Sequence, residues 1–374
     1  MGASDLIDDF YSFQPYELEA EKKEGLLLRE LTELTKFHQE HCRAYADFLE
    51  MTGYDPAKVQ ALYQIPFFPV RLFKEYDLIS IDRKSLFKTM TSSGTTGQKV
   101  SKIFLDKETA MAQQKVMIRI LSDFWGKKRL PMLIIDTPDV LKDRAKFSAR
   151  GAAIMGLSFV ARESVYALRE DMSLDLDKVR AFAEKYAGQR FIIFGFTFLV
   201  WQHFYQELCR TAQRFDFSQG FLMTGGGWKK LMGQAVSQAE FKRRIHEACG
   251  IRHFLDHYGM VEQTGAIYAE CEYGHLHASI FSDVLIRNYR DFSLCPIGQK
   301  GIIQVVSALP RSYPGHSLLT EDEGVILGED DCPCGRKGKY IQVLGRMAQA
   351  ELRGCSDTYA EEHGRDPGRA VSSR

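Results

Sequence analysis

Between residues 132 and 258 the chain alternates short apolar runs with longer segments in which apolar residues recur at helical spacing. A strand followed by a helix and then by another strand builds a parallel sheet, because the helix returns the chain to the edge from which it started. The alternation therefore predicts an α/β fold with a largely parallel sheet. The expected strands cover 132–136, 190–195, 220–224 and 251–258, and the expected helices between them cover 197–215 and 228–249.

The segments on either side of this alternation have a different character. Residues 17–49 and 107–125 are rich in helix formers, whereas the chain after residue 271 changes to short strands and turns. We expect those strands at 281–287, 301–306, 325–328 and 340–343. The chain then divides into a helical amino-terminal segment (1–60), an α/β core (61–310), a β-rich region with a short carboxyl-terminal arm (311–360) and a disordered polar tail (361–374).

Charge and hydropathy exclude several classes of protein. The 49 lysines and arginines balance the 49 aspartates and glutamates, which argues against a nucleic-acid-binding or membrane-surface protein. The amino terminus has no basic flank followed by an apolar run, so it is no secretory signal. The most apolar stretch, 191–201, is too short to span a hydrocarbon core of about 30 Å. We expect a cytoplasmic protein with no membrane span.

Residues 91–99 read TSSGTTGQK and form the sharpest local signal for an anion site. Glycine lets a backbone approach a phosphate closely, and serine and threonine hydroxyls can donate hydrogen bonds to its oxygens. Lys99 would add a positive charge, and the Walker ending Gly-Lys-Ser/Thr is missing. An ordinary connecting turn is the alternative. The candidate phosphate ligands are Ser92, Ser93, Gly94, Thr95, Thr96 and Gly97.

Two further glycine turns follow predicted strands, in the runs TGGGW (224–228) and DHYGMVEQTG (256–265). Ligands of open α/β sheets bind beyond the carboxyl ends of the strands, where such turns leave room for a base or a sugar. We therefore expect the turns at residues 94, 226 and 259 to converge on one nucleotide.

The run SSGTTG followed by YGxxE, which ends at Glu262, resembles the pattern of the adenylate-forming enzymes, the superfamily of acyl-CoA synthetases and luciferases. With FGFTFLVW and LGRMAQAELRGC, the chain is most similar to the acyl-protein synthetases of bacterial bioluminescence operons, and the phenylacetate-CoA ligases are close relatives. The resemblance covers residues 15–360. It implies the large adenylating domain with its α/β core, a small β-rich region and a truncated carboxyl-terminal domain.

The resemblance also implies a place for ATP and Mg²⁺. The loop 92–97 would hold the β- and γ-phosphates, and Glu262 would coordinate Mg²⁺. Asp322 would bind both ribose hydroxyls, and Arg346 would face the phosphate or the ribose. Each carboxylate taken alone reads equally as a solvated turn residue. The adenine would be lined by Gly225, Gly226, Gly227, His257, Tyr258 and Gly259.

The carboxyl end departs from the wider superfamily, whose mobile final domain of about a hundred residues carries a lysine that assists adenylation. Here about 28 residues follow Arg346, and none is a lysine in a recognisable context. The resemblance instead implies that Cys355 accepts the acyl group as a thioester. Arg353 would favour the thiolate, although an inert cysteine is the alternative. The final acceptor would be a partner such as an acyl reductase or an acyl carrier.

Four residues suggest a structural zinc site. Cys332 and Cys334 share one turn, and Cys271 and His277 lie on another. A Cys₃His set suits tetrahedral Zn²⁺, and phenylacetate-ligase relatives show a similar arrangement. Reduced structural cysteines are the alternative. We prefer His277 to His275 as the nitrogen ligand.

The aromatic run 194–201 is the best candidate for the wall of an acyl pocket, with core packing as the alternative. The leading hypothesis is a ligase that converts a fatty acid to acyl-AMP and then to an enzyme thioester on Cys355. The catalytic residues would be Glu262, Lys99 and Cys355. An acyl- or aryl-CoA ligase and a catalytically silent nucleotide-binding protein are the alternatives.

Overall fold

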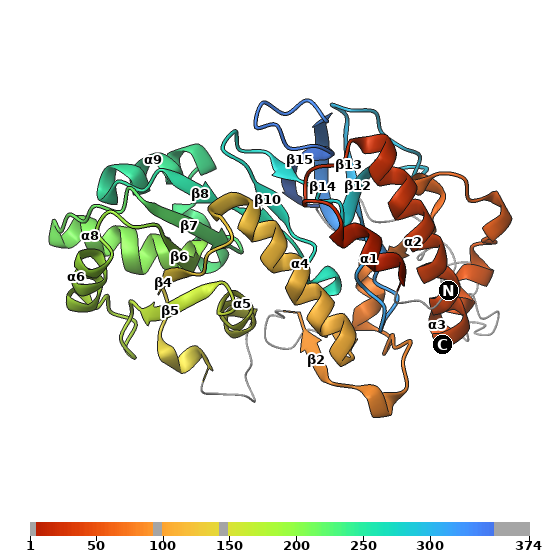
Figure 1. Cartoon of the computed structure of the whole chain (residues 1–374), viewed down its shortest axis with the longest axis horizontal. Helices are drawn as coiled ribbons and strands as arrows, with labels where there is room; N and C mark the ends of the chain where they lie inside the picture. Colours follow the sequence, from red (N-terminus) through yellow and green to blue (C-terminus); the bar gives the residue numbers. More distant parts are fainter. Residues whose placement is uncertain (1–4, 93–98, 142–148, 348–374) are drawn as a thin grey trace, which may run out of the picture.

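The computed structural model describes residues 5–92, 99–141 and 149–347, arranged as two lobes side by side (Figure 1). The helices are α1 (Asp5–Tyr11), α2 (Ala20–His41), α3 (Arg43–Met51), α4 (Lys107–Trp125), α5 (Ala149–Leu157), α6 (Leu176–Lys185), α7 (Thr197–Leu199), α8 (Gln206–Thr211) and α9 (Gln238–Cys249). The strands are β1 (Phe68–Pro69), β2 (Lys88–Thr91), β3 (Lys102–Leu105), β4 (Leu130–Ile134), β5 (Ala161–Tyr166), β6 (Phe191–Phe196), β7 (Gly220–Gly225), β8 (His253–Leu255), β9 (His257–Tyr258), β10 (Tyr268–Glu270), β11 (Leu276–His277), β12 (Ser282–Arg287), β13 (Lys300–Ser307), β14 (Ser317–Glu329) and β15 (Lys339–Arg346).

One lobe is built on a five-stranded sheet in the order β5-β4-β6-β7-β8, in which every neighbouring pair is parallel. Helices α5, α6, α8 and α9 surround this sheet (Figure 1). Every residue of β4 and β7 is buried, as a parallel sheet covered on both faces requires. The parallel α/β sheet expected from the alternation is thus confirmed.

The other lobe contains a larger, mostly antiparallel sheet. Its strands run in the order β12-β13-β14-β15-β11-β10-β9, and β1 adds a parallel pairing to β14. Tyr45 and Leu49 of α3 are buried in one cluster with Val284 and Ile286 of β12, so α3 packs on this sheet. Strands β2 and β3 form a separate two-stranded antiparallel ribbon.

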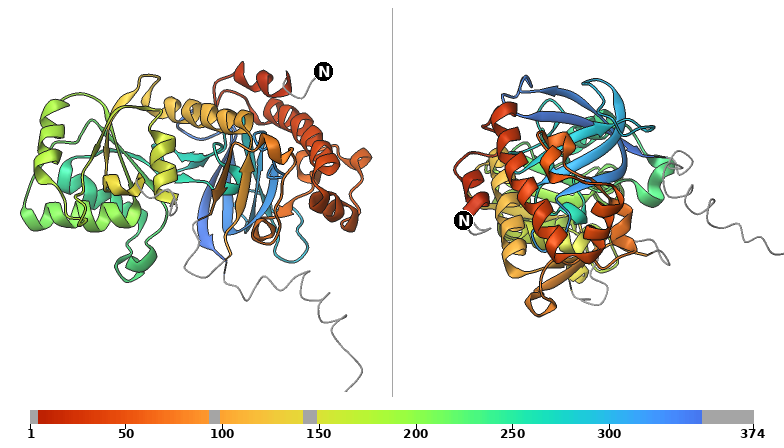
Figure 2. Two further views of the ribbon diagram at one scale, coloured as in Figure 1. Left: turned by 90° about the horizontal axis from the view of Figure 1, so that it is seen from below. Right: turned by 90° about the vertical axis from the view of Figure 1, so that its right-hand side faces the viewer.

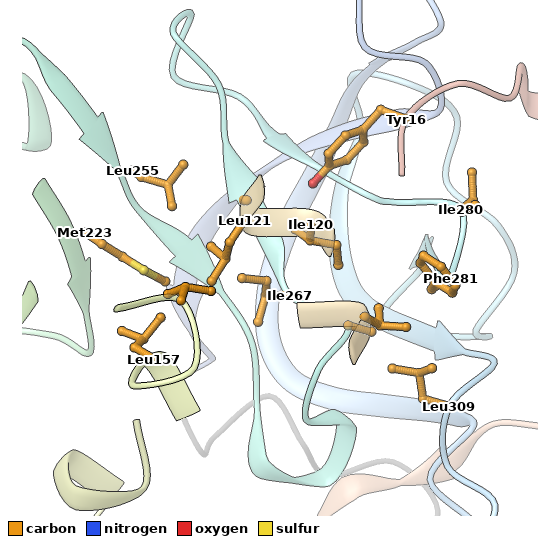
Figure 3. Packing of buried hydrophobic residues seen from close by; sticks show 14 of the residues in the cluster. Tyr16, Ile120, Leu121, Leu157, Met223, Leu255, Ile267, Ile280, Phe281 and Leu309 are labelled. Atoms are coloured by element: carbon orange, nitrogen blue, oxygen red, sulfur yellow. The ribbon is translucent and has the colours of Figure 1, made fainter. Parts of the chain in front are cut away.

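Helix α4 extends from one lobe to the other (Figures 1 and 2). Its residues Ile120 and Leu121 pack beside Ile267 of the other lobe, and Met223 and Leu255 of the parallel lobe lie on the side of Leu121 (Figure 3). All five belong to one buried cluster, so a single hydrophobic core joins the two sheets. Each fully buried side chain of this size contributes roughly 1.5–3 kcal/mol of hydrophobic stabilisation.

The parallel strands present their carboxyl ends to the second lobe. Strand β8 ends at Leu255, and β9 begins in the other sheet at His257. Because all five strands run in the same direction, the turns that follow β6, β7 and β8 meet at the seam between the lobes.

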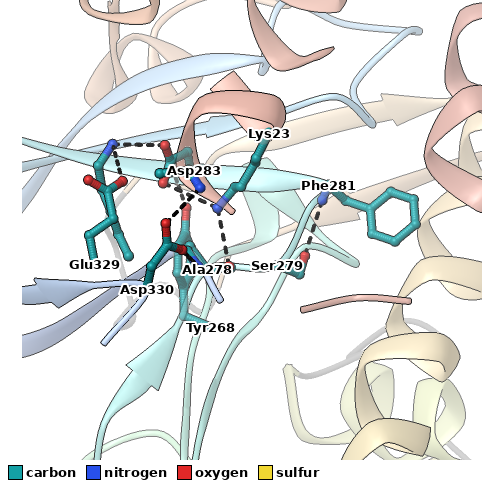
Figure 4. A network of polar contacts seen from close by, with 11 residues as sticks. Lys23, Tyr268, Ala278, Ser279, Phe281, Asp283, Glu329 and Asp330 are labelled. Carbon is teal, nitrogen blue, oxygen red and sulfur yellow. Dashed lines mark hydrogen bonds and ion pairs between the residues drawn. The ribbon is translucent and has the colours of Figure 1, made fainter. Parts of the chain in front are cut away.

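A buried ionic network ties α2 to the antiparallel sheet (Figure 4). Lys23 Nζ lies 3.3 Å from Asp283 Oδ1 and donates to the Ala278 carbonyl at 3.2 Å. Lys339 Nζ lies 2.8 Å from Asp283 Oδ2. Burial alone would raise the pKa of Asp283, but the two lysines hold it below its ordinary value. The carboxylate is therefore ionised and paired on both oxygens.

The structure corrects some expected elements. The helix expected over 17–49 is interrupted at Cys42, whose extended backbone separates α2 from α3. The helix expected from 228 begins only at Gln238, because the Ser237 hydroxyl accepts a hydrogen bond from the Glu240 N–H and caps α9 there. The strand expected over 325–328 is the end of the 13-residue β14.

The helices are partly charged rather than apolar throughout. The 22-residue helix α2 buries Leu27, Leu31 and Leu34 and exposes several charged residues. Within the described ranges, no helix combines the length and the apolar character needed to cross a bilayer.

Candidate functional site

The turn after β7 lies directly against β9. His257 donates a hydrogen bond from Nδ1 to the Thr224 carbonyl at 3.0 Å. A Cβ on Gly225 would lie only 3.0 Å from His257 Cε1, and a Cβ on Gly226 would lie 2.9 Å from the ring of Phe196. Gly226 also has φ = +69°, which a side chain would strain. The structure thus brings together two of the three glycine turns expected to bind a nucleotide.

A cavity of about 220 Å³ opens beside these glycines. Its apolar side is formed by Trp228, Phe241 and Phe254, a surface suited to a planar ring. Gly226, Gly227 and Asp256 also line the cavity. The cavity therefore lies next to the residues expected to line adenine, although Tyr258 and Gly259 border a smaller neighbouring space.

The polar wall of this cavity is a hydrogen-bonded cluster. Gln238 Nε2 donates to Asp256 Oδ2 and to Glu270 Oε1, both at 3.1 Å, and Lys242 Nζ donates to the same Glu270 oxygen at 2.7 Å. Burial raises the pKa of both carboxyls, and Lys242 opposes the rise. Sequence reasoning missed Gln238, Lys242 and Glu270, because they approach one another only through the packing of α9 on β10.

Tyr258 and Asp322 meet across 64 residues of sequence. The Tyr258 hydroxyl donates to Asp322 Oδ2 at 2.7 Å. Burial raises the pKa of Asp322, and this hydrogen bond opposes the rise. Arg346 is the cross-strand partner of Asp322 in the β14–β15 pair. Three residues expected to surround the nucleotide are therefore neighbours.

Glu262 lies in the short turn Val261–Gln263 and is only 6% exposed. Burial raises the pKa of its carboxyl, and nearby Ser101 and Lys74 oppose that rise. Ser101 also pairs with Ser92: its N–H donates to Ser92 Oγ at 2.9 Å, and its carbonyl accepts from the Ser92 N–H at 3.1 Å. The base of the hydroxyl- and glycine-rich loop thus lies close to Glu262.

The two basic candidates are held in exposed ion pairs. Lys99 Nζ lies 2.6 Å from Glu75, and Arg346 lies 2.5 Å from Glu321. Such exposed pairs contribute only about 0–1 kcal/mol, so either base can exchange its carboxylate for a phosphate at little cost. The remaining candidates lie outside the described residues, namely Ser93, Gly94, Thr95, Thr96, Gly97 and Cys355.

The aromatic run splits between core and seam. Phe194, Leu199, Val200 and Trp201 are almost completely buried and pack in the core, which accounts for them without a ligand. Among the aromatic residues of the run, Phe196 and Phe198 are partly exposed, and Phe196 is the residue against which Gly226 packs. Of the aromatic run, these two side chains remain as candidates for the wall of an acyl pocket.

A second polar cluster lies on the turn after β10, on β11 and on the turn before β15. One ligand atom each from Cys271, His277, Cys332 and Cys334 lies within 4.8 Å of the other three. Cys271 Sγ and Cys332 Sγ are 3.9 Å apart, and Cys334 Sγ is 3.4 Å from His277 Nε2. Tetrahedral Zn²⁺ would require about 3.8 Å and 3.6 Å for these separations, so the residues fit zinc. His275 contacts Cys332 from outside the set, with Nδ1 at 3.2 Å from Sγ.

The comparisons with known proteins agree over almost the full length of the chain. The profile of the family described as acyl-protein synthetase, LuxE, matches residues 1–363. The long-chain-fatty-acid–luciferin-component ligase of Vibrio harveyi is 23% identical over 372 residues, covering 95% of this chain and 93% of that protein. The ligase of the same description from Aliivibrio fischeri is 21% identical over 369 residues, with the same coverage of both chains.

Solved structures agree on the fold. 2-Hydroxyisobutyryl-CoA ligase in complex with 2-HIB-AMP and CoA has a TM-score of 0.70 at 17% identity, covering 89% of this chain and 70% of that one. The same enzyme in its postadenylation state has a TM-score of 0.68 at 16% identity, covering 88% of this chain and 69% of that one. The expected adenylate-forming fold is thus confirmed. The chain belongs to the LuxE family of acyl-protein synthetases and is an adenylate-forming ligase.

Proposed function

We propose that this ligase joins a long-chain fatty acid to AMP, transfers the acyl group to Cys355 and delivers it to a partner protein. The observation that carries the adenylation step is the meeting of Gly225–Gly227, Tyr258, Asp322 and Glu262 at one seam. These residues come from the ends of β7 and β9, from the middle of β14 and from the turn after β9. A shared cleft is what a bound nucleotide requires.

The nucleotide would lie along the seam. Its base would enter the 220 Å³ cavity, where Asp256 offers a carboxylate to an exocyclic amino group. The ribose hydroxyls would bind Asp322, whose Oδ2 now accepts the Tyr258 hydroxyl. The phosphates would extend toward Ser92 and Glu262.

In the first step an oxygen of the fatty carboxylate attacks the α-phosphorus, and the bond to pyrophosphate breaks. The products are a mixed acyl–phosphate anhydride and pyrophosphate. Glu262 fits Mg²⁺ as an acidic oxygen ligand, and when bound this ion neutralises charge on the phosphate oxygens. Lys99 and Arg346 would leave their present carboxylate partners and pair with the same phosphate oxygens. Their positive charges would lower the repulsion between the phosphates and the attacking carboxylate.

In the second step the Cys355 thiolate attacks the acyl carbonyl carbon, and AMP leaves with its phosphate oxygen. The thioester then passes to a thiol or an enzyme nucleophile of the partner. The names of the Vibrio harveyi and Aliivibrio fischeri relatives support a long-chain acid and a protein acceptor. Phe196 and Phe198 supply an apolar surface beside Gly226 on which an acyl chain can lie.

The adenylation proposal is tested by pyrophosphate release with a series of fatty acids of increasing chain length. We expect release to depend on the acid and to favour long chains. Glu262→Gln should lower the rate by roughly 100-fold, because a charge-stabilising ligand is lost. Unchanged release in that variant would refute the Mg²⁺ assignment, and no release with any acid would indicate a silent nucleotide-binding protein.

The transfer step separates two candidate functions. Radiolabelled fatty acid with ATP should label the wild-type protein and leave Cys355→Ser unlabelled. The fold of 2-hydroxyisobutyryl-CoA ligase favours a second candidate, an acyl-CoA ligase. In that case the label would leave the active site only when CoA is added, and Cys355→Ser would behave like the wild type.

We further propose that Cys271, His277, Cys332 and Cys334 bind a structural Zn²⁺. His277 is fully buried, and among the described residues its Nδ1 has no hydrogen-bond partner. None of the four residues belongs to the nucleotide site proposed above. The ion would therefore join the turn after β10, β11 and the turn before β15 rather than take part in catalysis. Metal analysis of the purified protein should give one zinc per chain, and Cys332→Ser should lose it.

A further inference from the structure

The main chain of Glu262 is held by a tyrosine that belongs to none of the motifs described above. The hydroxyl of Tyr313 donates to the Glu262 carbonyl at 2.9 Å. The same hydroxyl accepts a hydrogen bond from Gln113 Nε2 of α4 at 3.2 Å. Tyr313 is fully buried, and Gln113 is nearly so. A hydroxyl that donates once and accepts once has a fixed orientation, so this contact is directional.

The next residue of the turn is held from another side. Gln263 is buried, and its Nε2 donates to the Gly315 carbonyl at 2.8 Å and to the Val305 carbonyl at 3.2 Å. The turn is therefore connected to α4, to β13 and to the segment before β14. Each connection reaches the backbone or the neighbouring side chain, and none of them uses the Glu262 carboxylate.

Close packing prevents the turn from shifting. A Cβ on Gly265 would lie 2.4 Å from the Gln113 carbonyl oxygen, and a Cβ on Gly315 would lie 2.7 Å from the Glu262 carbonyl oxygen. Real Cβ atoms do not approach other atoms this closely, so only glycine permits α4 and the 313–315 segment to contact the turn. Helix α4 and the 313–315 segment therefore pack directly against the turn that carries Glu262.

We propose that Tyr313, oriented by Gln113, is a positioning residue that aims the Glu262 carboxylate at the metal of the nucleotide. This inference rests on the proposed function, in which Glu262 binds Mg²⁺. A divalent cation demands a precise placement of its carboxylate ligand, and the hydrogen bond from Tyr313 fixes the main chain from which that carboxylate extends. Tyr313 acts on the main-chain carbonyl of Glu262 and not on the substrate.

The test compares two tyrosines that make the same kind of bond. Tyr313→Phe removes only the hydroxyl and keeps the buried ring. Tyr268→Phe is the matched control, because the Tyr268 hydroxyl is also buried and donates to a backbone carbonyl, that of Asp283, at 2.8 Å. Both variants should lose thermal stability, because each removes a donor from a buried carbonyl, and Tyr313→Phe should lose somewhat more, because Gln113 Nε2 also loses its acceptor.

Only Tyr313→Phe should raise the Mg²⁺ concentration that gives half-maximal pyrophosphate release, by about fivefold, with the rate at saturating Mg²⁺ within about twofold of wild type. Gln113→Met should raise it less, and should add nothing in the Tyr313→Phe background, because both act through one hydroxyl. An unchanged Mg²⁺ requirement in Tyr313→Phe, or an equal rise in Tyr268→Phe, would overturn the inference.

Glu262→Gln separates this inference from the proposal on which it rests. If Glu262→Gln leaves the Mg²⁺ requirement unchanged, the assignment of Glu262 to the metal fails. If Glu262→Gln raises the requirement and Tyr313→Phe behaves as Tyr268→Phe does, only the positioning role of Tyr313 is refuted.

Discussion

Neutralising Glu262 should make the ligand-free protein more stable while it slows the reaction by roughly 100-fold. The carboxylate is 6% exposed, and burial raises its pKa above the ordinary value of 4.5. The charged form is therefore less favourable in the folded state than in the unfolded chain. Glu262→Gln keeps the shape of the side chain and removes the charge. Relief of a poorly compensated buried charge is worth roughly 1–3 kcal/mol, or an increase in Tm of about 1–4 °C for a chain of this length.

The sign of the pH dependence follows from the same shift. A raised folded-state pKa means that the folded protein binds the proton more tightly, so the contribution of Glu262 to stability is present below pH 4.5 and is lost as the pH rises through the folded pKa. The advantage of the glutamine variant should therefore be full above that pKa. It should disappear as the pH falls into the window between the raised pKa and 4.5.

Thermal unfolding monitored by circular dichroism, without nucleotide or metal, measures both effects. Glu163→Gln is a suitable control, because Glu163 is an exposed residue paired with Lys185 and its loss should lower Tm slightly or not at all. Adding Mg²⁺ and ATP should stabilise the wild type more than Glu262→Gln, since binding to the folded state adds stability. A variant no more stable than the wild type at pH 8, with equal protection by Mg²⁺ and ATP, would refute the reasoning.

Three further predictions concern other parts of the molecule. Gly226→Ala combines a strained φ of +69° with a Cβ 2.9 Å from the Phe196 ring, so the Kd for ATP should rise at least tenfold and stability should fall by roughly 1–3 kcal/mol. Isothermal titration with ATP and urea unfolding check this, and normal ATP affinity would contradict it. Asp283→Asn leaves the buried Lys23 without its paired carboxylate and Lys339 with Glu329 alone, so urea unfolding should show a loss of about 3–5 kcal/mol. A loss under 1 kcal/mol would show that the network is solvated. Prolonged chelation of the protein should lower Tm by several degrees, with full recovery on adding Zn²⁺ and none in Cys332→Ser; a Tm insensitive to the chelator would speak against the metal.

Much of the fold could be predicted because its signal is local. The helix expected over 107–125 coincides with α4, and the strand expected over 132–136 differs from β4 by two residues at each end. Continuous apolar runs bounded by glycine identify buried parallel strands well. Strands of two or three residues, such as β9 and β11, have too few residues for a period, and their place in the larger sheet depends on long-range pairing.

The candidate site likewise contains residues that lie in one sequence motif and residues that meet only in the folded chain. Tyr258 and Glu262 lie in one motif, so the sequence alone placed them near each other. Their partners could not be found in this manner, because Asp322 is 64 residues from Tyr258 and Tyr313 is 51 residues from Glu262. A buried tyrosine that donates to a backbone carbonyl has no sequence pattern of its own. Only the packing of α4 and the 313–315 segment on the turn reveals it.

Helix α4 affects how the free energy of nucleotide binding can be used. Because Ile120 and Leu121 of this helix belong to a core that both lobes share, separating the lobes would expose a large apolar area to water. The walls of the seam therefore stand at a fixed spacing before ATP arrives. None of the energy of binding has to be spent on bringing the two sheets together, and it can go instead into aligning the acid with phosphorus.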